Sequence, residues 1–589
     1  MSAPVQMGSA VFPEAQATRR VGFQASPTTI LAACAVAGVV YFCIAFLVVP
    51  NVAVLGEIIN PDKGTFAETV SDLWQSERVR RGVVNSFIVA VLSVITVNVV
   101  GCAQAFLLDG LAIKGRNLLI ACYALPLVFG GVSAVTGYSM VYGREGILTS
   151  FLQSIFPALP DNWFTGMWAV LFVHTFTMTG YHFLFLRPAL RRVDFSVVEA
   201  AQSLGVSPLV AFVKVVIPAL RPTIIAATLL VFIGGASSMA APMILGGSDF
   251  TMLTPIVQAL SGAGRYDMAA VLGLSLAVIT GGILVWAVRS EMKHQAHSGS
   301  KYSKPFQRLQ LKNGPLNVGA HVVAYFLALM NLLPLLMTIV MSFTPNVQIR
   351  RGEVGTAFTF EHFQSVFTDS SVGQPLINSL IMCAIAVPAA IVIGTFVVIL
   401  SHRYPGAFTG TLQGFLYMPY FLPGILIALG LLIAYGEPHV LIGFNVLVGS
   451  YWILPIAYVI TQLPTILRFV GASLAGVDPS YDEAGRSLGA GPLYRLARIT
   501  LPMLLPVIFQ VAAIGFNGVF DDYVLAVMLY NLNNRPLGVT LATMAMTLDP
   551  EIIGVATAFV VINTVLTLMV ILLADRMAER ASRFQSKEG

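Results

Sequence analysis

The chain has 589 residues, of which 57% are hydrophobic and only 10% are charged, with a formal net charge of +5. A soluble globular domain carries roughly 25% charged residues, so this composition excludes an ordinary soluble protein and favours one embedded in a lipid bilayer. The small positive excess gives no argument for nucleic-acid binding, because basic residues in loops between membrane spans account for it.

In chain order, the polar residues 1–27 predict an N-terminal tail, and long apolar runs then recur to the end of the chain. Each run is close to the ~20 residues that a helix needs to cross a bilayer core. Membrane barrels would show shorter alternating segments of about ten residues, so the predicted fold is an all-α membrane protein. Proline is expected to interrupt the third span of each half, at Pro126 in the first half and at Pro419 and Pro423 in the second. The expected spans, about twelve by length and hydropathy, are 28–50, 84–108, 117–142, 163–187, 223–246, 267–289, 317–343, 375–400, 411–435, 448–470, 507–530 and 553–574.

One polar heptapeptide occurs twice, as EAAQSLG at 199–205 and as EAGRSLG at 483–489. The similarity extends without a gap over 190–222 and 474–506. Each copy lies between the fourth and fifth expected span of its half. Each half has six expected spans, an even number, so both halves enter the membrane from the same side, as two parallel six-helix repeats related by an axis along the membrane normal.

This repeat divides the chain into a first half, 28–289, and a second half, 317–574, joined by the polar and basic linker 290–316 and followed by the tail 575–589. Short cytoplasmic loops are enriched in Lys and Arg. Most of the 33 basic residues fall on one side when the N-terminus is placed inside. Both termini, the linker and the repeated loops are therefore expected to be cytoplasmic.

Each repeated loop predicts a helix, a turn and a second helix. In the first copy Asp194 can cap the first helix, Gly205 can supply the permissive turn, and Pro208 suits the start of the second helix. Pro218 is expected to end that helix before the fifth span begins. The second copy repeats this plan, with prolines at the same relative positions.

The motif Glu-Ala-Ala (or Gly), three residues, Gly and a Pro-bounded exit resembles the EAA loop of the permease subunits of ABC importers, whose short second helix docks into a cleft of the ATPase. The resemblance implies a homodimeric ABC ATPase, a periplasmic binding protein that delivers a small-molecule substrate, and a multi-pass position in the lipid bilayer of the bacterial inner membrane. It implies no cofactor in this chain, with ATP and Mg on the partner ATPase. The implied ATPase-coupling residues are Glu199, Ala200, Gly205, Glu483, Ala484 and Gly489.

Two further segments narrow the resemblance. APMILGG, from residue 241, is similar to a segment of the first spermidine/putrescine permease subunit, and Phe-Asp-Asp at 520–522 is similar to one of the second subunit. The implied substrate is a polyamine or a 2-aminoethylphosphonate-like amine. Ferric iron and thiamine permeases of the same family are the alternatives.

Asp521 and Asp522 stand out on physical grounds, because carboxylates deep in a span are costly and normally face a protein interior or a watery cavity. The repeat places them opposite Ser237 and Ser238. These four residues are the hypothetical translocation path, whose carboxylates would suit an ammonium group. The alternative is that the helix breaks here and the aspartates cap an outer helical segment.

The remaining polar or reactive residues give weaker indications of function. His174 and His182, in the fourth expected span, are interpreted as hydrogen-bonded within the bundle, and the five cysteines as packing residues rather than as a metal or redox site. The stretch 110–117 approaches a phosphate loop but lacks the Lys-Ser/Thr ending and the strand-to-helix setting. A transport subunit is therefore expected, not an enzyme. Alternatives of other classes are an ion-coupled secondary transporter, which would not need Pro-bounded loops after its fourth spans, and a receptor or structural membrane protein.

Overall fold

The computed structural model describes residues 27–59, 65–144, 146–191, 193–294, 307–308, 310–311, 314–351, 353–547 and 550–587. Within these ranges the backbone is helical almost throughout, and its strand content is limited to one isolated bridge between His439 and Asn445. Residues 1–26 of the expected tail and most of the expected linker lie outside them. The all-α prediction is confirmed for the part of the chain that is described.

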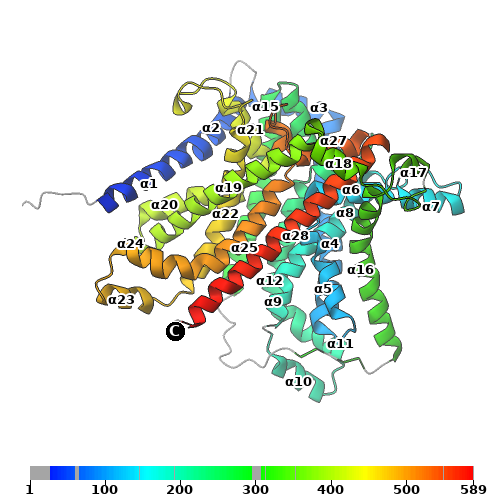
Figure 1. Ribbon diagram of the computed structural model, residues 1–589, viewed down its shortest axis with the longest axis horizontal. Helices are drawn as coiled ribbons and strands as arrows, with labels where there is room; N and C mark the ends of the chain where they lie inside the picture. Colours follow the sequence, from blue (N-terminus) through cyan, green and yellow to red (C-terminus); the bar gives the residue numbers. More distant parts are fainter. Residues whose placement is uncertain are drawn as a thin grey trace, which may run out of the picture.

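The first half contains long helices joined by short ones, coloured blue to green in Figure 1. Local sequence explains several of its boundaries. For example, α3 begins at a capping box, in which Thr65 and Glu68 bond each other's backbone amides. The bounds are α1 (Pro27–Cys43), η1 (Ile44–Val48), α2 (Val49–Ile59), α3 (Phe66–Gln75), α4 (Glu77–Ala105), η3 (Phe106–Gly110), α5 (Arg116–Ala124), η4 (Leu125–Leu127), α6 (Gly131–Tyr142), α7 (Ile147–Ile155), α8 (Gly166–Thr177), α9 (Thr179–Arg191), α10 (Phe195–Ser203), α11 (Pro208–Ala211), η5 (Phe212–Val216), α12 (Ile217–Ala236), α13 (Ala240–Leu245), α14 (Leu253–Gly262) and α15 (Tyr266–His294).

The second half repeats this order from green to red in Figure 1. Its last helix continues past the expected span and through the expected C-terminal tail as far as Lys587. The bounds are α16 (Gly314–Ser342), α17 (Asn346–Arg351), α18 (Glu361–Thr368), α19 (Ser370–Arg403), α20 (Ala407–Tyr417), η7 (Met418–Tyr420), α21 (Gly424–Tyr435), η8 (Val440–Ile442), α22 (Ile453–Ala475), α23 (Ser480–Ser487), α24 (Pro492–Arg495), η9 (Leu496–Thr500), α25 (Leu501–Phe520), α26 (Ala526–Leu529), α27 (Leu537–Thr547) and α28 (Pro550–Lys587).

The number of spans agrees with the expectation. In the described part of the chain 10 helices are long and apolar enough to cross a membrane, or up to 12 if each of two bent helix pairs is one span. The bent pairs, α5 to α7 and α20 to α21, turn by 111° and 108°. They are the third spans of the two halves, and each breaks at a 3-10 turn that contains the expected proline, Pro126 or Pro419.

The first span of each half packs on the other half. Helix α2 contacts α21, and α16 contacts α5 and α6. The hydroxyl of Tyr435 donates to the carbonyl of Ala45, and that of Tyr123 donates to the carbonyl of Ala324 at 2.9 Å. The two halves are therefore interlocked rather than merely adjacent.

Many apolar side chains on the long helices point away from the protein. Trp168 and Trp286 are 70% and 67% exposed, and the outer faces of α4, α16 and α28 carry further exposed aliphatic residues. A soluble protein rarely exposes so much apolar surface. These faces therefore suit contact with lipid, while the interior is closed by residues such as Tyr458 and Phe559.

Candidate coupling loops and the contact between the halves

The first repeated loop is a helix, a turn and a second helix. Helix α10 begins where Asp194 Oδ1 accepts a hydrogen bond from the Ser196 amide at 3.0 Å. Gly205 follows with a φ of +82°, in the left-handed region that favours glycine. Helix α11 then starts at Pro208. The predicted local structure of this loop is confirmed.

The second loop has the same geometry. Asp478 Oδ1 accepts from the Ser480 amide at 2.9 Å, and this hydrogen bond holds the pKa of Asp478 below its ordinary value. Gly489 has a φ of +75°. A Cβ on Gly205 or Gly489 would meet no atom within 4 Å, so the backbone conformation, and not crowding, accounts for the glycine. Figure 1 shows the two loops apart from each other along the lower side of the molecule.

The prediction that Pro218 ends the second loop helix is wrong. One helix runs from Phe212 to Ala236, and a π-turn lies just before the proline, where the Ile217 amide bonds the Phe212 carbonyl. Because this wider turn shifts the hydrogen-bond register, Pro218 enters α12 in its first turn, where the missing N–H costs little. In the second loop η9 precedes Pro502 in the same way. Each loop is therefore continuous with the fifth span of its half.

The glutamates and alanines implied for coupling lie on α10 and α23 in matching positions. The carbonyl oxygen of Glu199 accepts from Ser203 Oγ at 2.9 Å, and that of Glu483 accepts from Ser487 Oγ at 3.0 Å. Ala200 and Ala484, the next residues along their helices, are exposed, Glu483 is exposed, and Glu199 is half-buried. The two copies thus keep the same backbone contacts while presenting small side chains outward.

An exposed leucine that the sequence analysis did not single out precedes each turn glycine. Leu204 is 85% exposed and Leu488 is 87% exposed. Complete burial of a leucine is worth about 1.5–3 kcal/mol, so each loop presents apolar area that a partner can cover. The sequence signal for them was that leucine occupies the same position in both copies of the repeat.

The two loops differ in what fixes their helices to each other. In the first loop Val198 and Ala211 are both fully buried. Asp482 and Arg495 occupy the corresponding positions of the second loop, with Asp482 Oδ1 lying 3.4 Å from Arg495 Nε and 3.6 Å from Arg403 Nη2. One loop is therefore closed by apolar packing and the other by ion pairs.

The two intramembrane histidines are hydrogen-bonded inside the bundle, as expected. His174 Nδ1 lies 3.1 Å from Ser93 Oγ, and its Nε2 lies 2.9 Å from Ser238 Oγ. His182 Nε2 lies 3.0 Å from Asn98 Oδ1. Ser238, one of the four hypothetical path residues, is therefore held by a histidine of its own half.

Asp521 reaches across to the first half. Its Oδ2 accepts a hydrogen bond from the Ser133 amide at 3.0 Å, in the first turn of α6. Asn563 Nδ2 donates to Ser133 Oγ at 2.6 Å, and Asn517 Nδ2 donates to the Leu127 carbonyl at 3.1 Å. Because an acceptor at a helix N-terminus satisfies amides that lack intrahelical partners, these side chains of the second half hold the break in the third span of the first.

Asp522 has a different position. Its Oδ2 accepts from the amides of Leu525 and Ala526, each at 3.1 Å, at the start of α26. This is the geometry of the capping alternative, in which an outer helical segment begins after a break. The other oxygen of Asp521, Oδ1, is buried and has no hydrogen-bond partner in the described part of the chain.

Three of the four hypothetical path residues are held by different partners. Among the described residues no hydrogen bond joins Ser237 or Ser238 to Asp521 or Asp522, and Ser237 Oγ is buried without a hydrogen-bond partner there. Helix α6 instead contacts both α13, which follows the serines, and α27, which follows the aspartates. The broken third span therefore lies against both segments, and α13 and α27 also contact each other directly.

Two interlocked helical halves, each with a loop continuous with its fifth span, define a fused transport permease. The family described as the binding-protein-dependent transport system inner membrane component matches residues 115–289 and again 386–583, and the chain belongs to this family. It is a multi-pass permease subunit of a bacterial ABC importer and not an enzyme. Permeases of this family work with a periplasmic binding protein and an ATPase.

Relatives match along both halves or along one. A probable ABC transporter permease protein of Sinorhizobium fredii is 38% identical, over 90% of this chain and 94% of the relative. A ferric transport system permease protein of Actinobacillus pleuropneumoniae is 25% identical, over 90% of this chain and 76% of the relative. A spermidine/putrescine transport system permease protein of Haemophilus influenzae is 24% identical, over 40% of this chain and 89% of the relative.

Proposed function

We propose that this subunit moves a small solute inward, an amine or ferric ion, and that the two repeated loops transmit the closure of a homodimeric ATPase to the bundle. The observation that carries the coupling role is the duplicated geometry: an exposed leucine, a glycine with positive φ and a helix continuous with the fifth span. Both loops, both termini and the linker then face the cytoplasm, where most basic residues lie on this orientation.

The first candidate substrate is an amine of the polyamine or 2-aminoethylphosphonate type. Its support is Asp521, whose Oδ1 is buried and unbonded in the described structure next to the broken third span. A carboxylate oxygen is the acceptor that an ammonium group prefers, and interrupted helices are where translocation sites tend to be built. The spermidine/putrescine relative supports the same class.

Ferric ion is the second candidate, because the ferric transport relative matches along 90% of the chain. A hard cation also prefers carboxylate oxygen. Asp522 favours neither candidate, because both amides at the start of α26 already occupy one of its oxygens.

Whole-cell uptake separates these candidates. A deletion strain and the same strain carrying the wild-type gene would be supplied with labelled spermidine, putrescine, 2-aminoethylphosphonate, ferric ion or thiamine. We expect the gene to restore uptake of one amine. Restoration of ferric uptake alone would reject the amine and keep the importer, and restoration of none of the five would reject both candidates.

The coupling role is tested at the turn glycines. In Gly205→Val with Gly489→Val, a side chain in the left-handed region costs about 1–2 kcal/mol per position, and a β-branched residue is the least tolerant there. The turns should therefore change conformation, and uptake should fall to the level of the deletion strain while the protein stays in the membrane.

The matched control is Gly205→Asn with Gly489→Asn, because asparagine adopts this conformation more readily and neither site is crowded. We expect these variants to keep most of the uptake. Wild-type uptake by the double valine variant, with membrane levels equal on an immunoblot, would contradict the coupling role.

A further inference from the structure

An arginine cluster surrounds one buried carboxylate at the loop end of the first half. Asp109, whose side chain is only 3% exposed, lies 2.5 Å from Arg116 Nη2, 2.6 Å from Arg187 Nε and 3.2 Å from Arg191 Nη2. These residues come from η3, α5 and α9. One carboxylate cannot neutralise three guanidinium groups, so the cluster has an excess of positive charge.

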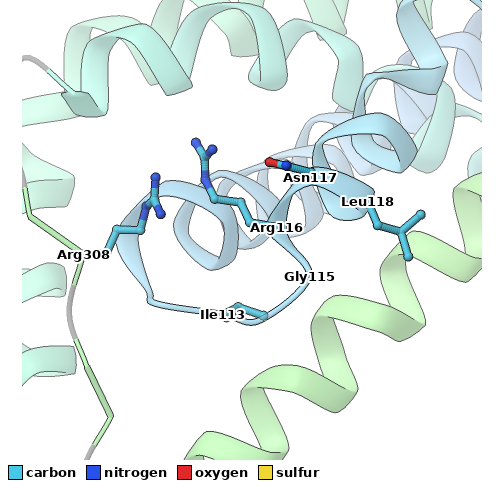
Figure 2. A pocket seen from close by; sticks show the side chains of 6 residues that line it. All are labelled: Ile113, Gly115, Arg116, Asn117, Leu118 and Arg308. Atoms are coloured by element: carbon cyan, nitrogen blue, oxygen red, sulfur yellow. The ribbon is translucent and has the colours of Figure 1, made fainter.

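A fourth arginine extends the cluster across an open pocket of about 430 Å³. Arg308, from the segment that joins the two halves, lines this pocket together with Arg116. Figure 2 shows the two guanidinium groups pointing the same way, with the side-chain amide of Asn117 next to the guanidinium group of Arg116. The complete lining is Ile113, Gly115, Arg116, Asn117, Leu118 and Arg308.

The charges around Arg308 are mostly of its own sign. Burial first, and then the nearby Arg116, lowers its pKa from the ordinary value, with further contributions from Arg191 and Arg187 against an opposing one from Asp109. No described carboxylate lies within ion-pair distance of Arg308. Arg308 thus lines the pocket without an ion-pair partner among the described residues, next to Arg116, which is paired with Asp109.

Neither topology nor the fold explains this arrangement. Cytoplasmic arginines orient membrane helices through their charge alone and have no need to converge on a pocket. The second half lacks the complete arginine cluster, because Ala475 occupies the position that corresponds to Arg191. The cluster is therefore a property of one half rather than a requirement of the fold or of a symmetric ATPase contact.

We propose that this pocket binds a phosphate-bearing anion. Guanidinium groups pair with phosphate oxygens through two parallel hydrogen bonds, and the pocket volume lies within the usual range for small-ligand sites. The ligand is either the headgroup of an anionic phospholipid, whose chains would lie along the exposed Leu118, or a free phosphate compound. Bound there, it would tie the segment between the halves to α5. Only the placement of this pocket on the cytoplasmic side rests on the proposed function. The binding itself can be measured without transport.

The test uses the full-length chain in nanodiscs and follows its thermal unfolding, because a ligand that binds the native state raises Tm. One arm adds inorganic phosphate to phosphatidylcholine discs at constant ionic strength. The other compares phosphatidylcholine discs with discs that also contain phosphatidylglycerol. We expect one arm to raise Tm, and Arg308→Gln to weaken the apparent affinity about tenfold, the loss typical of one charge-assisted hydrogen bond.

Arg308→Gln leaves every ion pair of Asp109 in place, so its own Tm without ligand should match the wild type. The control is Arg144→Gln, which removes an exposed arginine 3.9 Å from Asp161 in a different loop and should keep the full shift. A shift with phosphate supports a free ligand, and a shift with phosphatidylglycerol alone supports a lipid headgroup. No shift in either arm, or an equal shift in Arg308→Gln, overturns the proposal.

Discussion

At the scale of single residues, Asp521 joins the two halves, because it belongs to one half and caps a helix of the other. Its position deep in an expected span predicted a polar environment but did not identify the group that it contacts. A hydrogen bond between residues this far apart in the chain depends on how the halves pack, whereas the cap at Asp194 depends only on its immediate neighbours.

Substitutions at Asp521 separate capping from charge. Asp521→Leu leaves the buried Ser133 amide without an acceptor and should lower the free energy of unfolding by about 1–3 kcal/mol. Asp521→Asn keeps an acceptor oxygen and should retain most of the stability, yet lose uptake, because the negative charge is gone. Thermal unfolding and uptake measured on the same preparations distinguish the two effects.

Asp522→Asn is the matched control, because this carboxylate caps α26 within its own half. It should change uptake less than Asp521→Asn. If Asp521→Asn transports at the wild-type rate, Asp521 is a cap alone and the amine proposal loses its structural support.

At the scale of elements, the π-turns decide how each loop joins its span. A proline normally ends or kinks a helix because it lacks an N–H and clashes with the preceding turn. Here η5 and η9 precede Pro218 and Pro502, and the helices continue through them. A loop attached by a continuous helix can transmit a rigid movement to the bundle, which a flexible connection would absorb.

Replacement of Pro218 by alanine tests this continuity. Because the helix already passes through this position, Pro218→Ala should change the free energy of unfolding by less than about 1 kcal/mol and leave uptake near the wild-type level. Ala227→Pro, a buried control further along α12, should cost about 3 kcal/mol or more. A large stabilisation with lost uptake in Pro218→Ala would instead show that the proline acts as a hinge.

At the scale of the whole molecule, the two halves are joined because the first span of each half packs on the other half. Helix α2 lies on α21 and α16 lies on α5 and α6, so each half completes the other. The contacts made by Asn517, Asp521 and Asn563 add polar bonds to this apolar interface. The covalent linker is then one of several connections between the halves.

Separate expression of the halves tests this arrangement. Residues 1–300 and 301–589, produced together with an affinity tag on the first fragment only, should copurify, because these contacts do not require the linker. Deletion of residues 1–59 from the first fragment removes the packing of α2 on α21 and should reduce the recovery of the second. Failure of the intact fragments to associate would show that the linker holds the halves together.

The sequence by itself determined the helical membrane class, the two parallel repeats, the proline breaks in both third spans and the helix-turn-helix form of both loops. These features depend on hydropathy, on backbone preference and on hydrogen bonds within a few residues. The sequence also contained the repeated leucines Leu204 and Leu488, although their use as surface was not evident from it.

Only the tertiary structure decided which groups far apart in the chain meet. It brought Asp521 to the start of α6, Ser238 into hydrogen-bond distance of His174, and Arg308 next to Arg116. It also showed that the helix continues through Pro218. For Asp521 and for the pair of Ser238 and His174 the physical reason is the same. A buried polar group must find a partner, and the partner is selected by the packing of whole helices, which no local pattern of residues specifies.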